Sequence, residues 1–139
     1  MNAPLYTTEI LRLAASLAEP AALEREDGRA ELRSPTCGST IATAVALDHQ
    51  GRVAAISQRV HACAFGQASA ALLEKSAPGR THADMSQAIA ELEKWLGGSS
   101  AEPGWPGLSV LAPARARTAR HGAILLPVRA LLAAIEAAR

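Results

Sequence analysis

Two cysteines and one histidine are the side chains in this sequence best suited to binding a metal ion or carrying sulfur. Cys37 lies in the stretch SPTCGST, with Pro35 two residues before it and Gly38 directly after it. The proline restricts the backbone and the glycine frees it, which leaves the sulfur uncrowded. Cys63 and His121 follow further along the chain. Thiolate sulfur and imidazole nitrogen are ligands that zinc and iron accept, so these residues are the candidate metal ligands.

Spacing alone does not join these three residues into one site. The sequence has no Cys-x-x-Cys pair, so three unconnected side chains remain an alternative. Three further histidines compete with His121. His61 lies two residues before Cys63 and is a reserve ligand, whereas His49 and His82 are expected to be solvated polar residues.

Length and composition bound the protein class. A chain of 139 residues suits one domain, 1–139, with a core that needs no disulfide. The first residues lack a secretory pattern and the chain has only two cysteines, so we expect a cytoplasmic protein with reduced thiols. No run approaches the roughly 18 apolar residues of a membrane-spanning helix, so no membrane role is expected. The sequence contains no P-loop or dinucleotide-binding motif, and we do not expect an enzyme.

A local basic loop stands out against the net charge of +1. Arg115, Arg117 and Arg120 lie just before His121, while the acidic residues lie elsewhere. With one Phe and one Tyr the chain has little aromatic surface for stacking on bases, so we expect no nucleic-acid binding. The loop is either a solvated cluster or a surface that docks an acidic partner.

Hydrophobic periodicity predicts an α+β fold. Apolar residues spaced three and four apart indicate a first helix that ends near residues 19–20. Three short β-branched or alternating runs indicate antiparallel strands, two of them joined by a hairpin at Asp48 to Gly51. Later helices should cover one face of this sheet, with a capping-box pair at Thr81 and Asp84. The expected ranges are strands at 29–34, 40–48 and 52–60, helices at 65–79, 81–98 and 123–139, and a Gly/Pro/Ser linker at 98–107. Pro127 should kink the last helix unless it lies near its first turn.

These elements position the candidate ligands. Cys37 follows the first strand, Cys63 lies just past the third strand at the start of a helix, and His121 precedes the last helix. Loops at one edge of a sheet can meet, and a helix N-terminus favours the thiolate, which is the form that binds metals. The pattern therefore allows one site of three ligands with an open coordination position.

The order of these motifs resembles the IscU/NifU/SufU-type iron–sulfur cluster scaffold family over nearly the whole chain. Ser34 to Ser39 match that family's Asn-Pro-x-Cys-Gly-Asp loop. The family's second cysteine segment and its Gly-Lys/Arg-Thr segment are matched from Cys63 to Ser69 and at 79–81. The family's His-Cys-x-x-Leu helix start is matched at 121–125. The resemblance implies a SufE/NifU-like fold: an N-terminal helix, a three-stranded antiparallel sheet and helices packed on one face.

Two departures from the family pattern alter the ligand set. The aspartate after Cys-Gly, which is a metal ligand in the family, is Ser39 here. The third cysteine, a cluster ligand, is Gly122. The ligands carried over by the resemblance are therefore Cys37, Cys63 and His121. A fourth would come from His61, a second subunit or an exogenous thiol.

The resemblance implies a divergent scaffold, not an enzyme, that binds a labile Fe–S cluster or iron, with zinc or no cofactor as alternatives. A second hypothesis is a paralogue that docks to a cysteine desulfurase as an adaptor without assembling a cluster. A third is a persulfide relay with Cys37 as the sulfur acceptor. The implied partners are a cysteine desulfurase and apo-protein acceptors, and the chain would be a monomer or a weak homo-oligomer. An Hsp70-type chaperone is a further candidate because "LAPAR" at 111–115 resembles the family's Leu-Pro-Pro-Val-Lys segment.

Overall fold

The structure, a computed structural model, describes residues 6–35 and 38–138 of the chain. It contains helices and one sheet in the order expected for the α+β class. The elements are α1 (Thr8–Ala15), β1 (Gly28–Arg33), β2 (Thr40–Leu47), β3 (Val53–His61), α2 (Ala64–Ser76), α3 (His82–Leu96), the 3-10 segments η1 (Leu108–Ala116) and η2 (Thr118–Arg120), and α4 (His121–Ala137).

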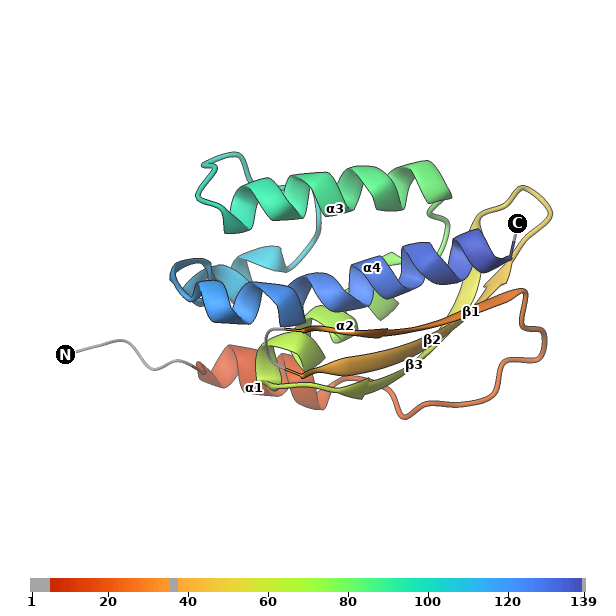
Figure 1. Cartoon of the computed structure of the whole chain (residues 1–139), viewed down its shortest axis with the longest axis horizontal. Helices are drawn as coiled ribbons and strands as arrows, with labels where there is room; N and C mark the ends of the chain where they lie inside the picture. The colour runs from red at the N-terminus through yellow and green to blue at the C-terminus, as the bar shows by residue number, and fades with distance from the viewer. Residues whose placement is uncertain (1–5, 36–37, 139) are drawn as a thin grey trace.

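The sheet is antiparallel with the strand order β1-β2-β3, and the helices gather on one of its faces. Figure 1 shows α4 running along the sheet and α3 lying outside α4. Helix α4 packs on β1 and β2, and α2 packs against α4, α1 and β3. One part of the core lies between the sheet and α4, where Ile41 of β2 meets Leu126 and Ala130. The larger part is formed by the helices with the sheet and extends to Leu92 and Trp95 of α3. The predicted fold is confirmed.

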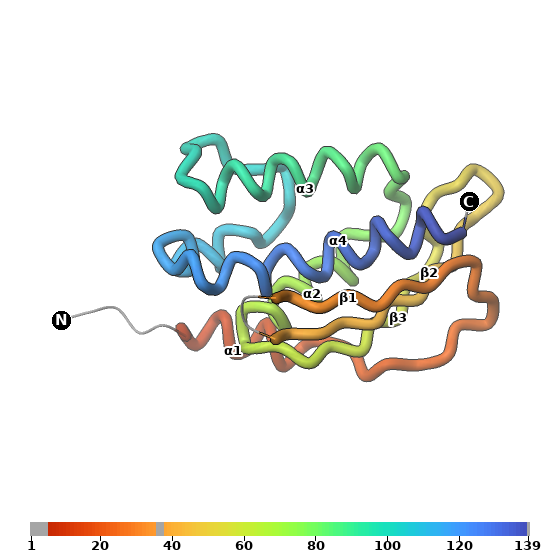
Figure 2. Tube along the Cα trace, viewed as in Figure 1, coloured from red at the N-terminus to blue at the C-terminus, as the bar shows by residue number. Residues whose placement is uncertain are grey.

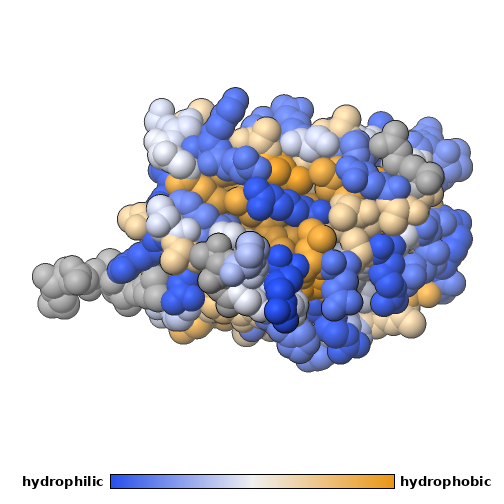
Figure 3. All heavy atoms as spheres, in the orientation of Figure 1, coloured by the Kyte–Doolittle hydropathy of each residue, from blue (hydrophilic) through white to orange (hydrophobic). Residues whose placement is uncertain are grey.

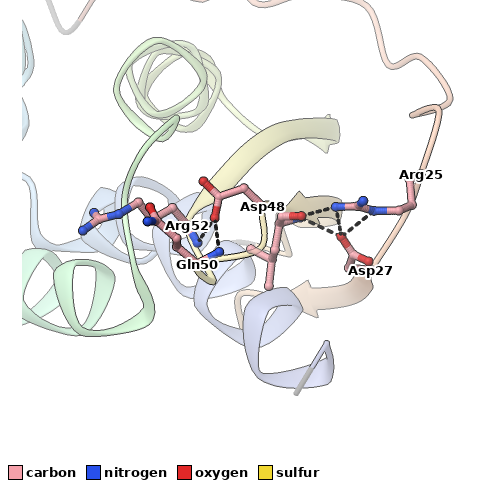
Figure 4. Close-up of polar contacts among 6 residues, drawn as sticks. Arg25, Asp27, Asp48, Gln50 and Arg52 are labelled. Carbon is pink, nitrogen blue, oxygen red and sulfur yellow. Dashed lines mark hydrogen bonds and ion pairs between the residues drawn. The ribbon is translucent and has the colours of Figure 1, made fainter.

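The β2–β3 hairpin forms at the predicted place. The carboxylate of Asp48 accepts hydrogen bonds from the backbone N–H groups of Gln50 (2.8 Å) and Arg52 (2.9 Å), as Figure 4 shows. These bonds, that of Arg52 above all, hold the pKa of Asp48 below its ordinary value. Gly51 has a φ of +76°, which a side chain would disfavour. An aspartate and a glycine therefore fix this turn.

A second polar contact fastens the segment before β1 to the end of β2. The Asp27 carboxylate accepts from the backbone N–H of Leu47 at 2.7 Å, and this bond is the main cause of its lowered pKa. The Arg25 guanidinium donates to the Leu47 carbonyl and pairs with Asp27 at 3.1 Å (Figure 4). The chain before the sheet is thereby held in register with it.

Helix α3 begins with the predicted capping box. The Thr81 hydroxyl accepts from the N–H of Asp84, and the Asp84 carboxylate accepts from the N–H of Thr81. His82, expected to be a solvated polar residue, is partly exposed, and its Nε2 lies 3.1 Å from Glu136 Oε1 of α4. Figure 3 shows apolar atoms in a band across the middle of this face, with polar side chains around them. Polar contacts thus supplement apolar packing between α3 and α4.

The first helix is shorter than expected. It ends at Ala15 because the Ser16 hydroxyl donates to the Leu13 carbonyl at 2.6 Å and the chain then leaves the helix. Figure 2 shows the chain after α1 passing along the sheet before it enters β1. The N–H of Ala21 donates to the Ser57 hydroxyl of β3 at 3.1 Å, so this segment contacts the sheet face that the helices leave open.

The segment at 98–107, predicted to be a linker, is packed against the protein. Trp105 is only 8% exposed, and Pro103 is buried as well. The abundance of Gly, Pro and Ser correctly indicated irregular backbone. Composition does not indicate which residues are buried, so it did not predict that Trp105 would anchor the segment to the protein.

Helix α4 begins at His121, two residues earlier than expected, so Pro127 is its seventh residue and not part of its first turn. The stretch 118–137 is long and apolar enough to cross a membrane by length and composition alone. However, 56% of that window is buried inside the protein. Its apolar character is therefore accounted for by its place between the sheet and the other helices.

Candidate functional site

Three chain segments meet at one end of the sheet, at the left of Figure 1. Arg33, the last residue of β1, pairs with Thr40, the first of β2, and Thr40 pairs with His61, the last of β3. The β1–β2 connection and the β3–α2 junction therefore leave the sheet at the same end. The first turn of α4 reaches the same place, because Gly122 lies against Ser34.

Small residues allow the first turns of α2 and α4 to pack closely. A Cβ on Gly66 would lie 3.2 Å from the Ala123 carbonyl oxygen and 2.7 Å from the Ala62 Cβ, so a larger residue would separate the helices. In the second turn of α2, the Ser69 hydroxyl donates to the Ile124 carbonyl at 2.6 Å. Pro127 has no N–H to offer the Ala123 carbonyl, and Gly66 lies directly beside that oxygen.

Cys63 is the N-cap residue of α2, as the sequence predicted. Its backbone is extended (φ −66°, ψ 173°) and its side chain makes no capping hydrogen bond. The thiol is free and half-buried. A sulfur that does not cap its own helix is available to another partner, such as a metal ion.

His121 is the first residue of α4 and is held by the preceding 3-10 segment. Its Nε2 lies 3.0 Å from the carbonyl oxygens of both Ala114 and Arg115. Because carbonyl oxygens only accept, Nε2 must carry the hydrogen, which in the neutral ring leaves the lone pair on Nδ1. Metal-binding histidines are typically oriented in this way, with one nitrogen bonded to a carbonyl and the other left for the metal.

The space beside Gly122 is taken by Ser34, a contact that sequence reasoning missed. A Cβ at residue 122 would lie 2.8 Å from the Ser34 Oγ, so any side chain there would force the serine to move. Ser34 is 4% exposed, and its hydroxyl has no hydrogen-bond partner in the part of the chain that the structure describes. The missing third cysteine therefore does not leave a hole. No pattern in the sequence connects these two positions.

The remaining candidate positions differ in their surroundings. His61 is exposed at the end of β3, beside Thr40. Ser39 is buried, and its carbonyl accepts from the N–H of Ser34 at 2.8 Å. Cys37 lies outside the described residues. Within 6–35 and 38–138, no three His, Cys, Asp or Glu side chains are grouped so that they could hold a metal ion. The set of Cys37, Cys63 and His121 thus stays a prediction.

The basic loop is partly structural. Arg115 stacks its guanidinium over the Trp95 ring, 5.0 Å from the ring centroid, and donates to the carbonyls of Trp95 (2.8 Å) and Ser99 (2.7 Å). Arg117, in contrast, is exposed and makes no side-chain hydrogen bond or ion pair within 6–35 and 38–138. Arg117 and its neighbour Arg120 are therefore the charges left for a docking partner.

The segment "LAPAR", at 111–115, is folded into η1. Leu111 and Ala114 are fully buried, and Arg115 is committed to Trp95. A chaperone that reads such a segment as an extended peptide would first have to unfold it.

Two pockets of the described structure lie away from Cys63 and His121. One of about 240 Å³ is lined by the C-terminal part of α2, by α3 and by Trp105. The other, about 230 Å³, lies between residues 20–26 and the outer face of the sheet.

Solved structures similar to this one include a NifU-like protein and a protein described as an iron–sulfur cluster assembly scaffold. The N-terminal part of a NifU-like protein from Brucella abortus superposes with a TM-score of 0.84 and 28% identity, covering 95% of this chain and 92% of that one. A protein from Fervidobacterium islandicum, assigned as an iron–sulfur cluster assembly scaffold for the SUF system, has a TM-score of 0.80 and 18% identity. It covers 94% of this chain and 96% of its own. No protein-family profile and no protein of curated function matches the sequence.

Together with the order of helices and strands, these likenesses define an α+β protein of the NifU-like fold. The chain has the fold of these NifU-like and SufU structures, and the resemblance drawn from its motifs is confirmed.

Proposed function

We propose that this protein is a divergent iron–sulfur cluster assembly scaffold that holds a labile cluster, or a metal ion, as its cargo. The proposed ligands are Cys37, Cys63 and His121. The observation that best supports the proposal is the state of His121, whose Nε2 is tied to two carbonyls so that Nδ1 is left for a metal. Cys63, whose thiol is free, is the N-cap residue of α2, and this helix packs beside α4.

The chemistry of this ligand set suits cargo that is later passed on. Two thiolates and one imidazole leave a coordination position for His61, a second subunit or an exogenous thiol. An incomplete protein ligand set holds a metal weakly, because each missing ligand removes a bond. The cluster or metal ion is then transferred to an acceptor protein more easily than from a site whose ligands are all supplied by the protein. Such a protein is not an enzyme, and its reduced thiols fit a cytoplasmic location.

The proposed partners follow from the cargo. A cysteine desulfurase would supply sulfur, and apo-proteins would accept the finished cluster. Arg117 and Arg120 supply positive charge beside His121 for an acidic surface of such a partner. An Hsp70-type chaperone has weaker support, because Leu111 and Ala114 of its candidate segment are buried.

One observation favours the alternative function as an adaptor or persulfide relay for a desulfurase. Gly122 supplies no thiol, and Ser34 occupies the adjoining space. A relay needs only one acceptor thiol, for which Cys37 is the candidate, whereas a cluster needs several ligands.

Anaerobic reconstitution with iron, sulfide and a desulfurase tests the proposal. Bound iron, sulfide and zinc are measured for the wild type, Cys37→Ser, Cys63→Ser and His121→Ala. His49→Ala, at the hairpin turn, is the matched control. We expect the three ligand variants to retain less cargo than the wild type and the control to retain as much. A wild type that retains no iron, sulfide or zinc overturns the scaffold function, and a persulfide on Cys37 by mass spectrometry then identifies the relay.

A further inference from the structure

Trp105 carries a buried indole N–H that the fold leaves without a partner. The residue is 8% exposed, and its Nε1 has no hydrogen-bond partner among residues 6–35 and 38–138. Its backbone, in contrast, is used, since the N–H donates to the Pro103 carbonyl (2.7 Å) and the carbonyl accepts from the Leu108 N–H (3.2 Å). A buried tryptophan N–H usually has a partner, because burial removes the water that would otherwise accept its hydrogen bond.

Trp105 lines a pocket of about 240 Å³ between the C-terminal part of α2, the first half of α3 and the segment 103–105. The structure describes the chain without a gap from 38 to 138, which includes every segment that lines this pocket. Buried apolar side chains form part of its wall, among them Leu73 of α2 and Met85 of α3. A Cβ on Gly104 would meet no atom within 4 Å, so the space beside this glycine is open. The pocket thus combines apolar surface with a residue whose N–H donor is unpaired.

The size of the pocket limits what it can hold. Pockets for drug-sized ligands and cofactors have volumes of about 300–1,000 Å³, so this pocket is small for such a molecule. Pockets at protein interfaces commonly take one large side chain of the partner, which carries much of the binding energy. The volume therefore favours a single apolar side chain with its adjoining peptide group.

The polar side chains of the pocket decide which charge suits the occupant. At one end, Arg80 offsets the charge of Asp84, whose carboxylate already caps α3. Two turns further along α3, Glu91 accepts a hydrogen bond only from the neutral amide of Gln87 (3.0 Å). The negative charge at the Glu91 end disfavours an anionic ligand there and favours a basic residue beside the apolar side chain.

We propose that this pocket docks a partner protein through one apolar side chain, such as leucine, whose backbone carbonyl accepts the N–H of Trp105 and whose basic neighbour lies near Glu91. A backbone carbonyl is a neutral acceptor that accompanies every side chain of a peptide, so one residue of the partner supplies both the apolar group and the acceptor. The pocket lies at the end of α2 opposite to Cys63. A partner held there leaves the candidate metal ligands accessible, and the inference does not depend on any bound cargo.

Capped dipeptides test the pocket directly on the apo-protein. In the nitrogen-15-labelled protein each of the two tryptophans gives one indole N–H signal, and Trp105→Phe identifies the signal of Trp105. The probe is acetyl-Leu-Lys-amide. Acetyl-Gly-Lys-amide lacks the apolar side chain, and acetyl-Leu-Glu-amide reverses the charge. Trp95 does not line the pocket, so its indole signal is the internal reference.

We expect the indole proton of Trp105 to move downfield and to saturate with the leucine–lysine peptide at a dissociation constant on the order of 1 mM, while the Trp95 signal stays in place. The glycine peptide should bind about tenfold more weakly, the factor that corresponds to burying one leucine side chain. The leucine–glutamate peptide should also bind more weakly than the leucine–lysine peptide. A Trp105 signal that does not move, or a glycine peptide that binds as tightly as the leucine peptide, overturns the inference.

Two variants separate the hydrogen bond from the charge. Trp105→Phe keeps an aromatic ring but removes the N–H, so it should bind the leucine–lysine peptide about fivefold more weakly, as followed at the backbone amide of Ala88 in the pocket. Glu91→Gln should bind the lysine and glutamate peptides equally. A Trp105→Phe protein that binds as tightly as the wild type overturns the inference, as does a Glu91→Gln protein that still prefers lysine. The proposed scaffold function is unaffected by any of these outcomes, because no cargo is present.

Discussion

The hydroxyl of Ser69 in α2 donates a hydrogen bond of 2.6 Å to the carbonyl oxygen of Ile124 in α4. Both residues are fully buried, and the bond lies one turn beyond the residues that begin the two helices. It therefore fixes how the helix carrying Cys63 lies against the helix carrying His121.

Removing this bond should loosen the contact between the helices. We expect Ser69→Ala to lower the free energy of unfolding by about 1 kcal/mol, the net value of a typical buried hydrogen bond. The matched control is Ser76→Ala, because the Ser76 hydroxyl donates to carbonyls of its own helix, those of Leu72 and Leu73. Its effect should be smaller. Urea denaturation measures both, and a Ser69→Ala protein as stable as the wild type would contradict the prediction.

Restoring a cysteine at residue 122 should conflict with Ser34. The new Cβ would lie 2.8 Å from the Ser34 Oγ, so the serine would have to turn to another rotamer inside a packed region. We expect Gly122→Cys to cost about 1 kcal/mol of stability, which is the cost of a strained rotamer or slight overpacking. The double variant Ser34→Gly, Gly122→Cys should regain part of that loss. If the single variant unfolds at the same urea concentration as the wild type, the space is not limited as we infer.

The orientation of His121 can be tested without any metal. Its Nε2 faces two carbonyl oxygens, so the neutral ring should carry its hydrogen on Nε2 and leave Nδ1 unprotonated. Nitrogen-15 NMR of the ring distinguishes the two tautomers. His49, exposed in the hairpin turn, serves as the reference without such a constraint. Finding the hydrogen of His121 on Nδ1 would remove the main support for its role as a ligand.

The parts of the fold that sequence reasoning predicted best are those fixed by neighbours along the chain. The carboxylate of Asp48 bonds to amides two and four residues away, and Thr81 and Asp84 cap each other. These residue types at this spacing suffice to predict a turn and a helix start. The same local rules placed Cys63 at the start of α2.

The contacts that shape the candidate site were not predictable in this way. Ser34 and Gly122 are far apart in the sequence and meet only because α4 returns to the end of β1. Arg115 looked like a member of a free basic loop, since nothing in its neighbourhood indicates the Trp95 ring on which it stacks. Non-local partners are decided by packing, which a single sequence does not display.

Arg115 and Arg117 should therefore respond differently to substitution. Arg115→Ala removes two hydrogen bonds to carbonyls and a cation–π contact, and we expect a loss of about 1–2 kcal/mol of stability. Arg117→Ala should change stability by less than about 0.5 kcal/mol, as is usual for exposed residues. Thermal unfolding followed by tryptophan fluorescence measures both. Similar losses for the two variants would show that Arg115 has no special structural role.

The capping box of α3 should make stability depend on acid pH. The backbone N–H of Thr81 is the main cause that holds the pKa of Asp84 below its ordinary value. A carboxylate with a lowered pKa in the folded state stabilises the protein fully above its unfolded-state pKa of about 4. That stabilisation is lost as the pH falls through the folded-state pKa.

Asp84→Asn should reduce stability at pH 7 and flatten its decline below about pH 4, because the neutral amide does not titrate there. Glu102→Gln is the control, since Glu102 is exposed and forms no hydrogen bond or ion pair within the described residues. Urea denaturation at a series of pH values gives the slope for each variant. An Asp84→Asn protein whose stability falls with acid as steeply as that of the wild type would mean that this carboxylate is not the one whose protonation destabilises α3.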